Sequence, residues 1–294
     1  MVFTNPRLNP ESLKRFYSKI GAYDDRPSTK DLDHRFDLLR RIDLLTYYFK
    51  YPILKVSRIK KLIQYPNYLR IRRLWKSILF IPKYKKNGKI LDIGCAYGGF
   101  LYKLKKLGWE VKGIELSEEA VEYCINNYKL NVEKVSIEEY QTDEKFDIIY
   151  LRNVLEHIES PKKALTKIVS FLKPEGLLII SLPDFSGLEV RLFKKYSYCL
   201  QLPFHLYHFT PNTLDNYLKL VGLESQGLFH IKTDREIIGP LSYILIKHPN
   251  KLLIKFILKI LSKKIVRRTL LHGLLNIQAF IGKTSRMTII AKKI

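Results

Sequence analysis

The sequence predicts an α/β fold, and three features of residues 90–114 indicate it. Residues 90–93 form a short apolar strand that runs directly into a turn with three glycines within residues 94–99. Residues 100–104 then carry apolar side chains at helical spacing, and residues 109–114 form a second apolar strand. A strand, a tight glycine turn, a helix and another strand make up the repeating unit of a parallel sheet covered by helices.

The glycine turn has the composition of a site for a nucleotide-like cofactor. Its spacing matches a degenerate dinucleotide pattern, Gly94-x-Ala96-x-x-Gly99, and also an acidic pattern, Asp92-x-Gly94-x-Ala96-x-Gly98. Asp92 favours the acidic pattern, because its carboxylate would repel a pyrophosphate but can help to hold a ligand that carries an ammonium and a sulfonium group. The alternative is an ordinary strand-to-helix turn that binds no ligand.

Glu115 is a second candidate for cofactor binding. It follows the strand at residues 109–114, about 20 positions beyond the turn, where a carboxylate can accept hydrogen bonds from both ribose hydroxyls. Ser117 is the expected cap of the next helix. The alternative role for Glu115 is to support the dipole of that helix together with Glu118 and Glu119.

Two later segments, residues 146–157 (FDIIYLRNVLEH) and 171–181 (FLKPEGLLIIS), continue the pattern. In this order the four segments resemble the class I S-adenosylmethionine-dependent methyltransferases, over roughly residues 85–235 and the last strand at 286–291. The resemblance implies a Rossmann-like, mostly parallel seven-stranded sheet with an antiparallel last strand, and S-adenosyl-L-methionine as cofactor. Ala96 departs from the family, which mostly has glycine there; at a positive φ this costs on the order of 1 kcal/mol.

The resemblance also implies a set of cofactor contacts. The methionine half is expected at the glycine turn, the ribose at the end of the second strand, the adenine after the third strand, and the amino acid end just past the fourth. These residues are Asp92, Gly94, Cys95, Ala96, Gly98, Glu115, Leu116, Ser136, Ile137, Leu151 and Asn153. Ile137 has the alternative role of a core residue.

Residues 183–211 are the expected acceptor segment, because open α/β sheets bind ligands at the carboxyl ends of their strands. Thr210 and Pro211 have the pattern of a helix cap and first helical residue, so His205 and His208 lie just before a helix. The segment Pro203–Pro211 resembles one found in family members that methylate sugars, lipids or other small metabolites.

A hydroxyl acceptor benefits from a general base, and histidine titrates near neutral pH. The candidates are His205, then His157, then His208; the alternative for each is a structural role such as capping a helix. His157 follows Glu156 in a block that resembles the metal-binding block of quinone-ring O-methyltransferases. Asn153 replaces the carboxylate expected in that block, so no metal site is predicted.

The composition indicates one α/β domain with appendages. The chain has 294 residues, 46% of them hydrophobic. Cys95, Cys124 and Cys199 are odd in number and lack the spacing of metal ligands, which favours a reducing compartment. Residues 1–10 lack the apolar core of a signal peptide, and no apolar run approaches the about 18 residues of a spanning helix. We therefore expect a cytoplasmic protein.

The formal net charge of +24 is concentrated in two segments. Residues 44–91 contain 13 Lys or Arg, residues 237–294 contain 12, and neither segment contains an acidic residue. The remainder is close to neutral. The sequence therefore divides into a helical N-terminal extension or lid (1–84), a cofactor-binding core (85–235), a basic amphipathic helical insertion (236–284) and the last core strand (285–294).

The insertion has the pattern of a helix that lies in a membrane interface. From Pro249 and Asn250 onward, a basic residue recurs every four positions beside a wide apolar sector. These residues are Lys251, Lys255, Lys259, Lys263 and Arg267. Such a helix attracts anionic headgroups, and the alternative is a helix packed on the protein's own core.

The basic segment 44–91 is rich in Tyr and Trp, which suits either a membrane interface or unpaired nucleic-acid bases. The aliphatic residues of the insertion favour a membrane, because phosphate binding needs charge rather than apolar bulk.

Together these features predict a methyltransferase, peripheral at the inner membrane face. Its expected acceptor is a lipid-linked sugar, an envelope glycan precursor or another lipid-like small molecule. Two alternatives stay open: an RNA methyltransferase that binds phosphates through the basic segments, and a noncatalytic binding protein with a vestigial cofactor pocket. The sequence predicts neither the oligomeric state nor whether oxygen, nitrogen or carbon is methylated.

Overall fold

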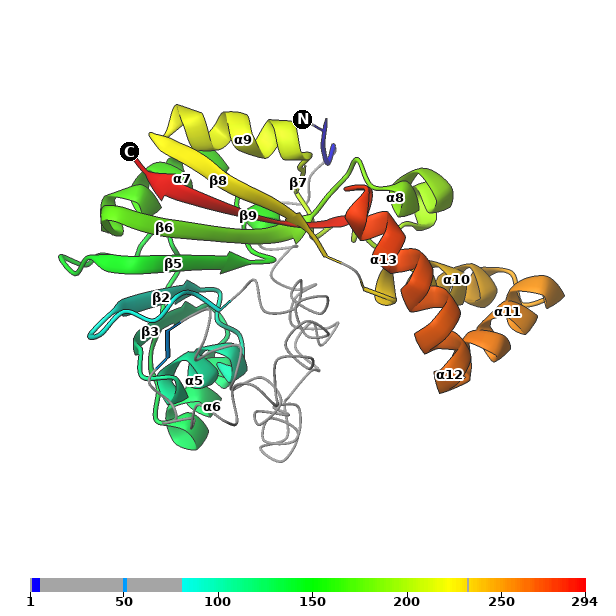
Figure 1. Cartoon of the computed structure of the whole chain (residues 1–294), viewed down its shortest axis with the longest axis horizontal. Coiled ribbons are helices and arrows are strands. Elements are labelled where there is room, and N and C mark those ends of the chain that lie inside the picture. Colours follow the sequence, from blue (N-terminus) through cyan, green and yellow to red (C-terminus); the bar gives the residue numbers. More distant parts are fainter. Residues whose placement is uncertain (1, 6–49, 52–80, 232) are drawn as a thin grey trace, which may run out of the picture.

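The computed structural model describes residues 2–5, 50–51, 81–231 and 233–294, and Figure 1 shows a central twisted sheet flanked by helices. The strand order is β4-β3-β2-β5-β6-β9-β8. The strands are β2 (Lys89–Ile93), β3 (Glu110–Glu115), β4 (Asn131–Lys134), β5 (Phe146–Arg152), β6 (Leu172–Pro183), β8 (Leu223–His230) and β9 (Arg286–Lys293). Neighbouring strands from β4 to β6 are parallel, whereas β9 is antiparallel to both β6 and β8. The predicted seven-stranded sheet with an antiparallel last strand is therefore confirmed.

Helices follow the strands, and their capping residues agree with the sequence patterns. The helices of the core are α5 (Gly99–Lys106), α6 (Glu118–Tyr128), η2 (Leu155–His157), α7 (Pro161–Phe171), α8 (Leu188–Phe193), η3 (Lys194–Tyr196) and α9 (Pro211–Leu220). Ser117 caps α6 by accepting from the Ala120 N–H, and Thr210 caps α9 through a capping box with Thr213. A short second sheet pairs β1 (Val2–Phe3) with β7 (Tyr207–His208).

Apolar side chains of the strands alternate between two buried layers. On β5, Ile149 and Leu151 pack in the larger core cluster, which also contains side chains of α7 and α9. Ile148 and Tyr150 point to the opposite face, where they pack with Leu104 of α5 and its neighbours. The sheet is thus buried on both faces, and its carboxyl edge is left for the functional groups.

Tyr51 belongs to the core, although it lies in the basic, aromatic segment 44–91. Its side chain is 1% exposed; the hydroxyl donates to the Pro82 carbonyl at 2.9 Å and accepts from Trp109 Nε1 at 2.6 Å. Residues 52–80 of that segment, and most of the predicted extension 1–84, lie outside the described residues.

β6 begins at Leu172, and its register with β5 shifts between Phe146 and Ile148, so residues 173–176 form an irregularity within a longer strand. β8 ends at His230, and α10 (Arg235–Lys247) follows it.

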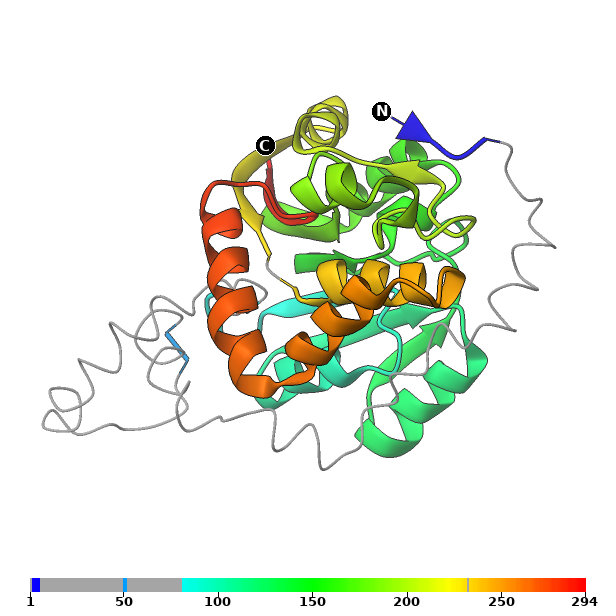
Figure 2. The same cartoon turned by 90° about the vertical axis from the view of Figure 1, so that its right-hand side faces the viewer.

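The insertion is several helices and not the single basic helix expected from residue 249 onward. These helices are α10 (Arg235–Lys247), α11 (Leu252–Ser262), α12 (Lys264–Val266), the π-helical turn η4 (Arg267–Leu271) and α13 (His272–Phe280). Lys263 ends α11 in an extended conformation, so the basic row is interrupted before Arg267. Figures 1 and 2 place the insertion beyond the carboxyl ends of the parallel strands. No helix within the described residues combines the length and the apolarity needed to cross a bilayer.

Candidate functional site

The turn after β2 bends through residues with positive φ and packs closely against the chain's own side chains. Gly94 and Gly98 have φ of +68° and +70°, and an added Cβ would lie 2.5 Å from Val154 Cγ2 at the first position and 2.6 Å from Cys124 Sγ at the second. Ala96 also has a positive φ, +48°, so the strain expected at this departure from the family pattern is present. Only glycine fits both positions without displacing a neighbouring side chain.

Asp92 leaves one buried carboxylate oxygen for a ligand. The side chain is fully buried, and its Oδ2 accepts from Arg152 Nη2 at 3.2 Å. Oδ1 has no hydrogen-bond partner among the described residues. Burial raises the pKa of Asp92, whereas the Arg152 guanidinium lowers it. An ammonium group is the kind of donor that the orphaned oxygen needs, so Asp92 fits the amino acid end of S-adenosylmethionine.

Glu115 ties the end of β3 to the glycine turn. Its Oε2 accepts from the Ala96 N–H at 2.9 Å, and its Oε1 accepts from the N–H groups of Leu116 at 2.7 Å and Ser117 at 3.0 Å. The carboxylate therefore supports the start of the next helix, as the alternative role required, and the expected ribose contact of Glu115 stays a prediction. Cys95 is buried beneath this turn and Leu116 is exposed beside it.

The other expected cofactor residues differ in their hydrogen bonds and in their burial. Ser136 bonds locally, with its hydroxyl donating to Glu139 Oε2 and accepting from the Glu139 N–H. Ile137 and Leu151 are buried in the larger core cluster, so the alternative core role of Ile137 describes its side chain. Asn153, at φ +56°, donates its N–H to the Ser181 carbonyl and accepts at Oδ1 from Arg286 Nη1 at 2.6 Å.

The three candidate histidines lie close to one another, and His157 and His205 also lie beside Glu156. Ring centroids of His157 and His205 are 4.9 Å apart, and those of His205 and His208 are 6.5 Å apart. Burial lowers the pKa of His205 to about 3 and also lowers that of His208. A neutral imidazole with so low a pKa can accept a hydrogen bond at pH 7 but has little driving force to take a proton.

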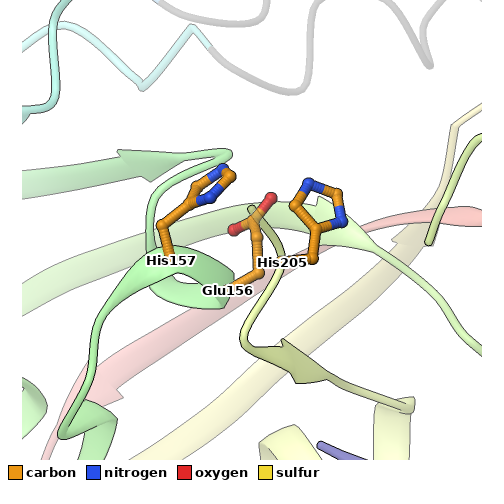
Figure 3. A group of neighbouring side chains, drawn as sticks. All are labelled: Glu156, His157 and His205. Atoms are coloured by element: carbon orange, nitrogen blue, oxygen red, sulfur yellow. The ribbon is translucent and has the colours of Figure 1, made fainter. Parts of the chain in front are cut away.

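Glu156 joins this group and lies between the two imidazoles in Figure 3. One possible ligand atom from each of Glu156, His157 and His205 lies within 4.8 Å of the others, a grouping that can hold a metal ion. The absence of a metal site, expected from the sequence, stays a prediction. Sequence reasoning considered Glu156 and His157 together but His205 separately, because His205 comes from a distant segment and only the fold brings it to Glu156.

Two arginines near the site were missed in the sequence. Arg152 pairs with Asp92 and lies over the Phe100 ring, 3.9 Å from its centroid. Arg286 contacts Asn153 and also donates from Nε to Glu236 Oε1 at 3.1 Å. The available signal was position: Arg152 ends β5 and Arg286 begins β9, at the edge where the site residues gather.

Comparison with known proteins gives a consistent assignment. A family model described as a methyltransferase domain matches residues 66–226. A ubiquinone biosynthesis O-methyltransferase of Rickettsia typhi is 26% identical over 176 residues, which is 58% of this chain and 68% of the relative. One from Rickettsia bellii is 32% identical over 98 residues, which is 32% of this chain and 41% of the relative. A solved S-adenosylmethionine-dependent methyltransferase of Listeria monocytogenes, described as putative, shares the fold with a TM-score of 0.50 and 15% identity, over 76% of this chain and 99% of that one.

Proposed function

The chain belongs to the S-adenosylmethionine-dependent class I methyltransferase family, and from this premise we propose that it methylates a lipid-like small molecule at a membrane surface. Lipid-linked sugars and envelope glycan precursors are the acceptor classes expected from the sequence. The names of the relatives favour the wider class of lipid-like small molecules, since ubiquinone is itself lipid-soluble.

The reaction is an in-line displacement in which an acceptor atom forms a bond to the methyl carbon as the bond to sulfur breaks. The cofactor supplies the methyl group on a positively charged sulfonium. For this reaction the residues at the turn need only bind and align: Gly94 and Gly98 allow its tight bend, Asp92 offers an oxygen to an ammonium, and Glu115 offers a carboxylate to hydroxyls. An acceptor hydroxyl would pass its proton to the imidazole of His157, the half-buried member of the cluster of His157, His205 and His208.

The exposure of α11 is the observation that supports membrane binding in this proposal. Eight of its eleven residues are aliphatic or aromatic, yet none is buried. Leu252 is 75% exposed and Phe256 is 61% exposed. Apolar residues so concentrated on one short helix mark a surface that another apolar phase covers. The alternative of a helix packed on the core describes α13, where Leu275 and Ala279 are buried.

The charge of this surface supports a membrane with anionic lipids as the apolar phase that covers it. Residues 237–294 have 12 basic and no acidic residues, and Lys251, Lys255 and Lys259 are exposed along α11. Each Lys or Arg near an anionic leaflet contributes about 1 kcal/mol of attraction. Because the insertion lies beyond the carboxyl ends of the parallel strands, a bound bilayer would be on the acceptor side of the enzyme (Figure 2).

Transfer of labelled methyl from S-adenosylmethionine into a fractionated cell extract tests the acceptor class. We expect label in the lipid fraction. Label confined to RNA would overturn the proposal in favour of the RNA alternative. Absence of transfer together with absence of adenosylhomocysteine binding by calorimetry would favour the noncatalytic alternative.

Co-sedimentation with vesicles tests the membrane surface. We expect binding to phosphatidylglycerol-containing vesicles and weak binding to phosphatidylcholine alone. Leu252→Asp with Phe256→Asp should weaken binding by at least tenfold, because each buried apolar side chain contributes about 1.5–3 kcal/mol. Leu220→Asp is the matched control, since Leu220 is 64% exposed on α9 of the core. Equal loss in both proteins, or no loss in either, would refute the membrane role of α11.

A further inference from the structure

Residues 2–5 lie against the acceptor segment at the histidine cluster, although Thr4 and His205 are 201 positions apart in the chain. β1 pairs antiparallel with β7, and Figure 1 shows this pair near the N mark. We propose that Thr4, directly after β1, is a positioning residue that holds His157 and His205 in place for methyl transfer. This inference rests on the proposed function, in which His157 takes the proton of an acceptor hydroxyl.

Thr4 makes two hydrogen bonds to the acceptor segment. Its N–H donates to the Leu206 carbonyl at 3.0 Å, which extends the ladder of β1 and β7 by one residue. Its hydroxyl donates to the His205 carbonyl at 2.6 Å. Any residue except proline could supply the first bond, but the second needs a side-chain donor. The residue type at position 4 therefore determines whether residues 2–5 hold the His205 carbonyl.

Leu206 lies between residues 2–5 and the turn after β5. Its carbonyl accepts from Thr4, and its N–H donates to the Glu156 carbonyl oxygen at 2.8 Å. Glu156 belongs to η2, which also carries His157. Residues 204–206 are thus held from two sides, and loss of the Thr4 hydroxyl would remove one of the two bonds that Thr4 contributes.

The peptide segment that Thr4 holds also orients an imidazole. His157 Nδ1 lies 2.9 Å from the Phe204 carbonyl oxygen. His205 Nδ1 lies 2.7 Å from the Cys199 carbonyl oxygen. A carbonyl only accepts, so Nδ1 carries the proton in each neutral ring and the lone pair lies on Nε2. A proton from the acceptor would therefore go to Nε2 of His157, and the Phe204 carbonyl would stabilise the resulting imidazolium through its bond with Nδ1.

Apolar burial does not account for the position of β1. Val2 is 49% exposed and Phe3 is 54% exposed, so neither side chain is a core residue. A two-stranded ladder is marginally stable by itself. The hydrogen bonds of Thr4, which is half-buried, add to this short ladder beside His205. We therefore expect Thr4 to affect the histidines more than the stability of the fold.

Substitution of Thr4 separates positioning from general stability. Thr4→Val keeps the shape of the side chain but removes the hydroxyl, and Thr4→Ser retains a donor. Thr166→Val is the matched control, because the Thr166 hydroxyl donates to the Lys162 carbonyl at 3.0 Å within α7.

The readout is transfer of label from S-adenosylmethionine into the lipid fraction of a cell extract. We expect Thr4→Val to lower the maximal rate by at least about fivefold, the factor that corresponds to one net hydrogen bond. The S-adenosylmethionine concentration at half-maximal rate should stay the same. Thr4→Ser should restore most of the rate, and Thr166→Val should retain it. A Thr4→Val protein as active as Thr166→Val, or a Thr4→Ser protein as slow as Thr4→Val, would overturn the proposal.

Nitrogen NMR of histidine-labelled protein tests the positioning without cofactor or acceptor. At about pH 8, where imidazole is ordinarily neutral, we expect His157 signals of a ring protonated at Nδ1, assigned by their loss in His157→Gln. Thr4→Val should show a mixture of both tautomers, and Thr4→Ser the wild-type signals. An unchanged tautomer in Thr4→Val would overturn the proposal. If the wild type transfers no methyl to lipid, the proposed function fails, and the NMR result still decides whether Thr4 positions His157.

Discussion

Alanine substitution of two glycines with nearly equal φ separates the conformational requirement of the cofactor turn from its packing requirement. Gly98 has φ +70°, and an added Cβ would lie 2.6 Å from Cys124 Sγ and 2.8 Å from Leu130 Cδ1. Gly222, between α9 and β8, has φ +75° and no atom within 4 Å of an added Cβ. Gly222→Ala is therefore the matched control for Gly98→Ala.

The magnitudes follow from this difference in surroundings. A left-handed alanine costs about 1–2 kcal/mol at either position, and the loss of unfolded-state freedom returns about 0.4–1 kcal/mol at either. Gly222→Ala should thus lower the free energy of unfolding by about 1 kcal/mol. Gly98→Ala adds an overpacking cost of about 1–3 kcal/mol, because Cys124 and Leu130 are both buried. We expect a total loss of about 2–4 kcal/mol at Gly98.

Urea unfolding followed by circular dichroism gives both free energies, and calorimetry with adenosylhomocysteine gives the affinities. We expect Gly98→Ala to lose cofactor affinity by more than tenfold and Gly222→Ala to retain it. Equal stability losses in the two variants would refute the packing argument. Unchanged affinity in a folded Gly98→Ala protein would refute the placement of the cofactor at this turn.

Two further predictions concern buried polar groups. Tyr51→Phe leaves the Pro82 carbonyl and Trp109 Nε1 without their shared partner, so urea unfolding should show a loss of about 1–3 kcal/mol; a loss below 0.5 kcal/mol, on the order of the scatter of surface substitutions, would contradict the contact. For His205, the folded pKa of about 3 lies below the usual 6.5, so the unfolded chain binds more protons between these values and stability falls as the pH falls through this window. In metal-free buffer, the wild type should lose about 2.5 kcal/mol more than His205→Gln between pH 7 and pH 4.5, and equal losses would show that His205 is not buried.

Local patterns in the sequence identified the elements that carry the cofactor turn. The strand at 90–93, the glycine turn, Ser117 and Thr210 all act through neighbours within a few residues, so spacing alone determines their roles. The positive φ of Ala96 could be anticipated for the same reason, because the bend of the chain depends on a few consecutive residues.

Long-range partners could not be predicted in this way. Arg152 is 60 residues from Asp92 and Arg286 is 133 residues from Asn153, and sequence spacing contains no information on contacts formed by sheet registry. The break at Lys263 was missed because the four-residue basic period continues across it, although the helix does not. Tyr51 was grouped with surface aromatics, since a basic neighbourhood does not reveal which ring reaches the core.

A polar bridge joins the insertion to the carboxyl edge of the sheet. Glu236, in the first turn of α10, accepts from Arg286 at the start of β9, and Arg286 in turn donates to Asn153 just after β5. The Cys199 thiol of the acceptor segment also donates to Glu236, at 3.4 Å. Because Glu236 is buried, separating α10 from the sheet would leave its carboxylate without these partners, which is strongly destabilising. The contacts of Glu236 therefore hold the start of α10 beside the acceptor segment, so a membrane bound by the insertion would lie on the same side of the protein as the histidine cluster.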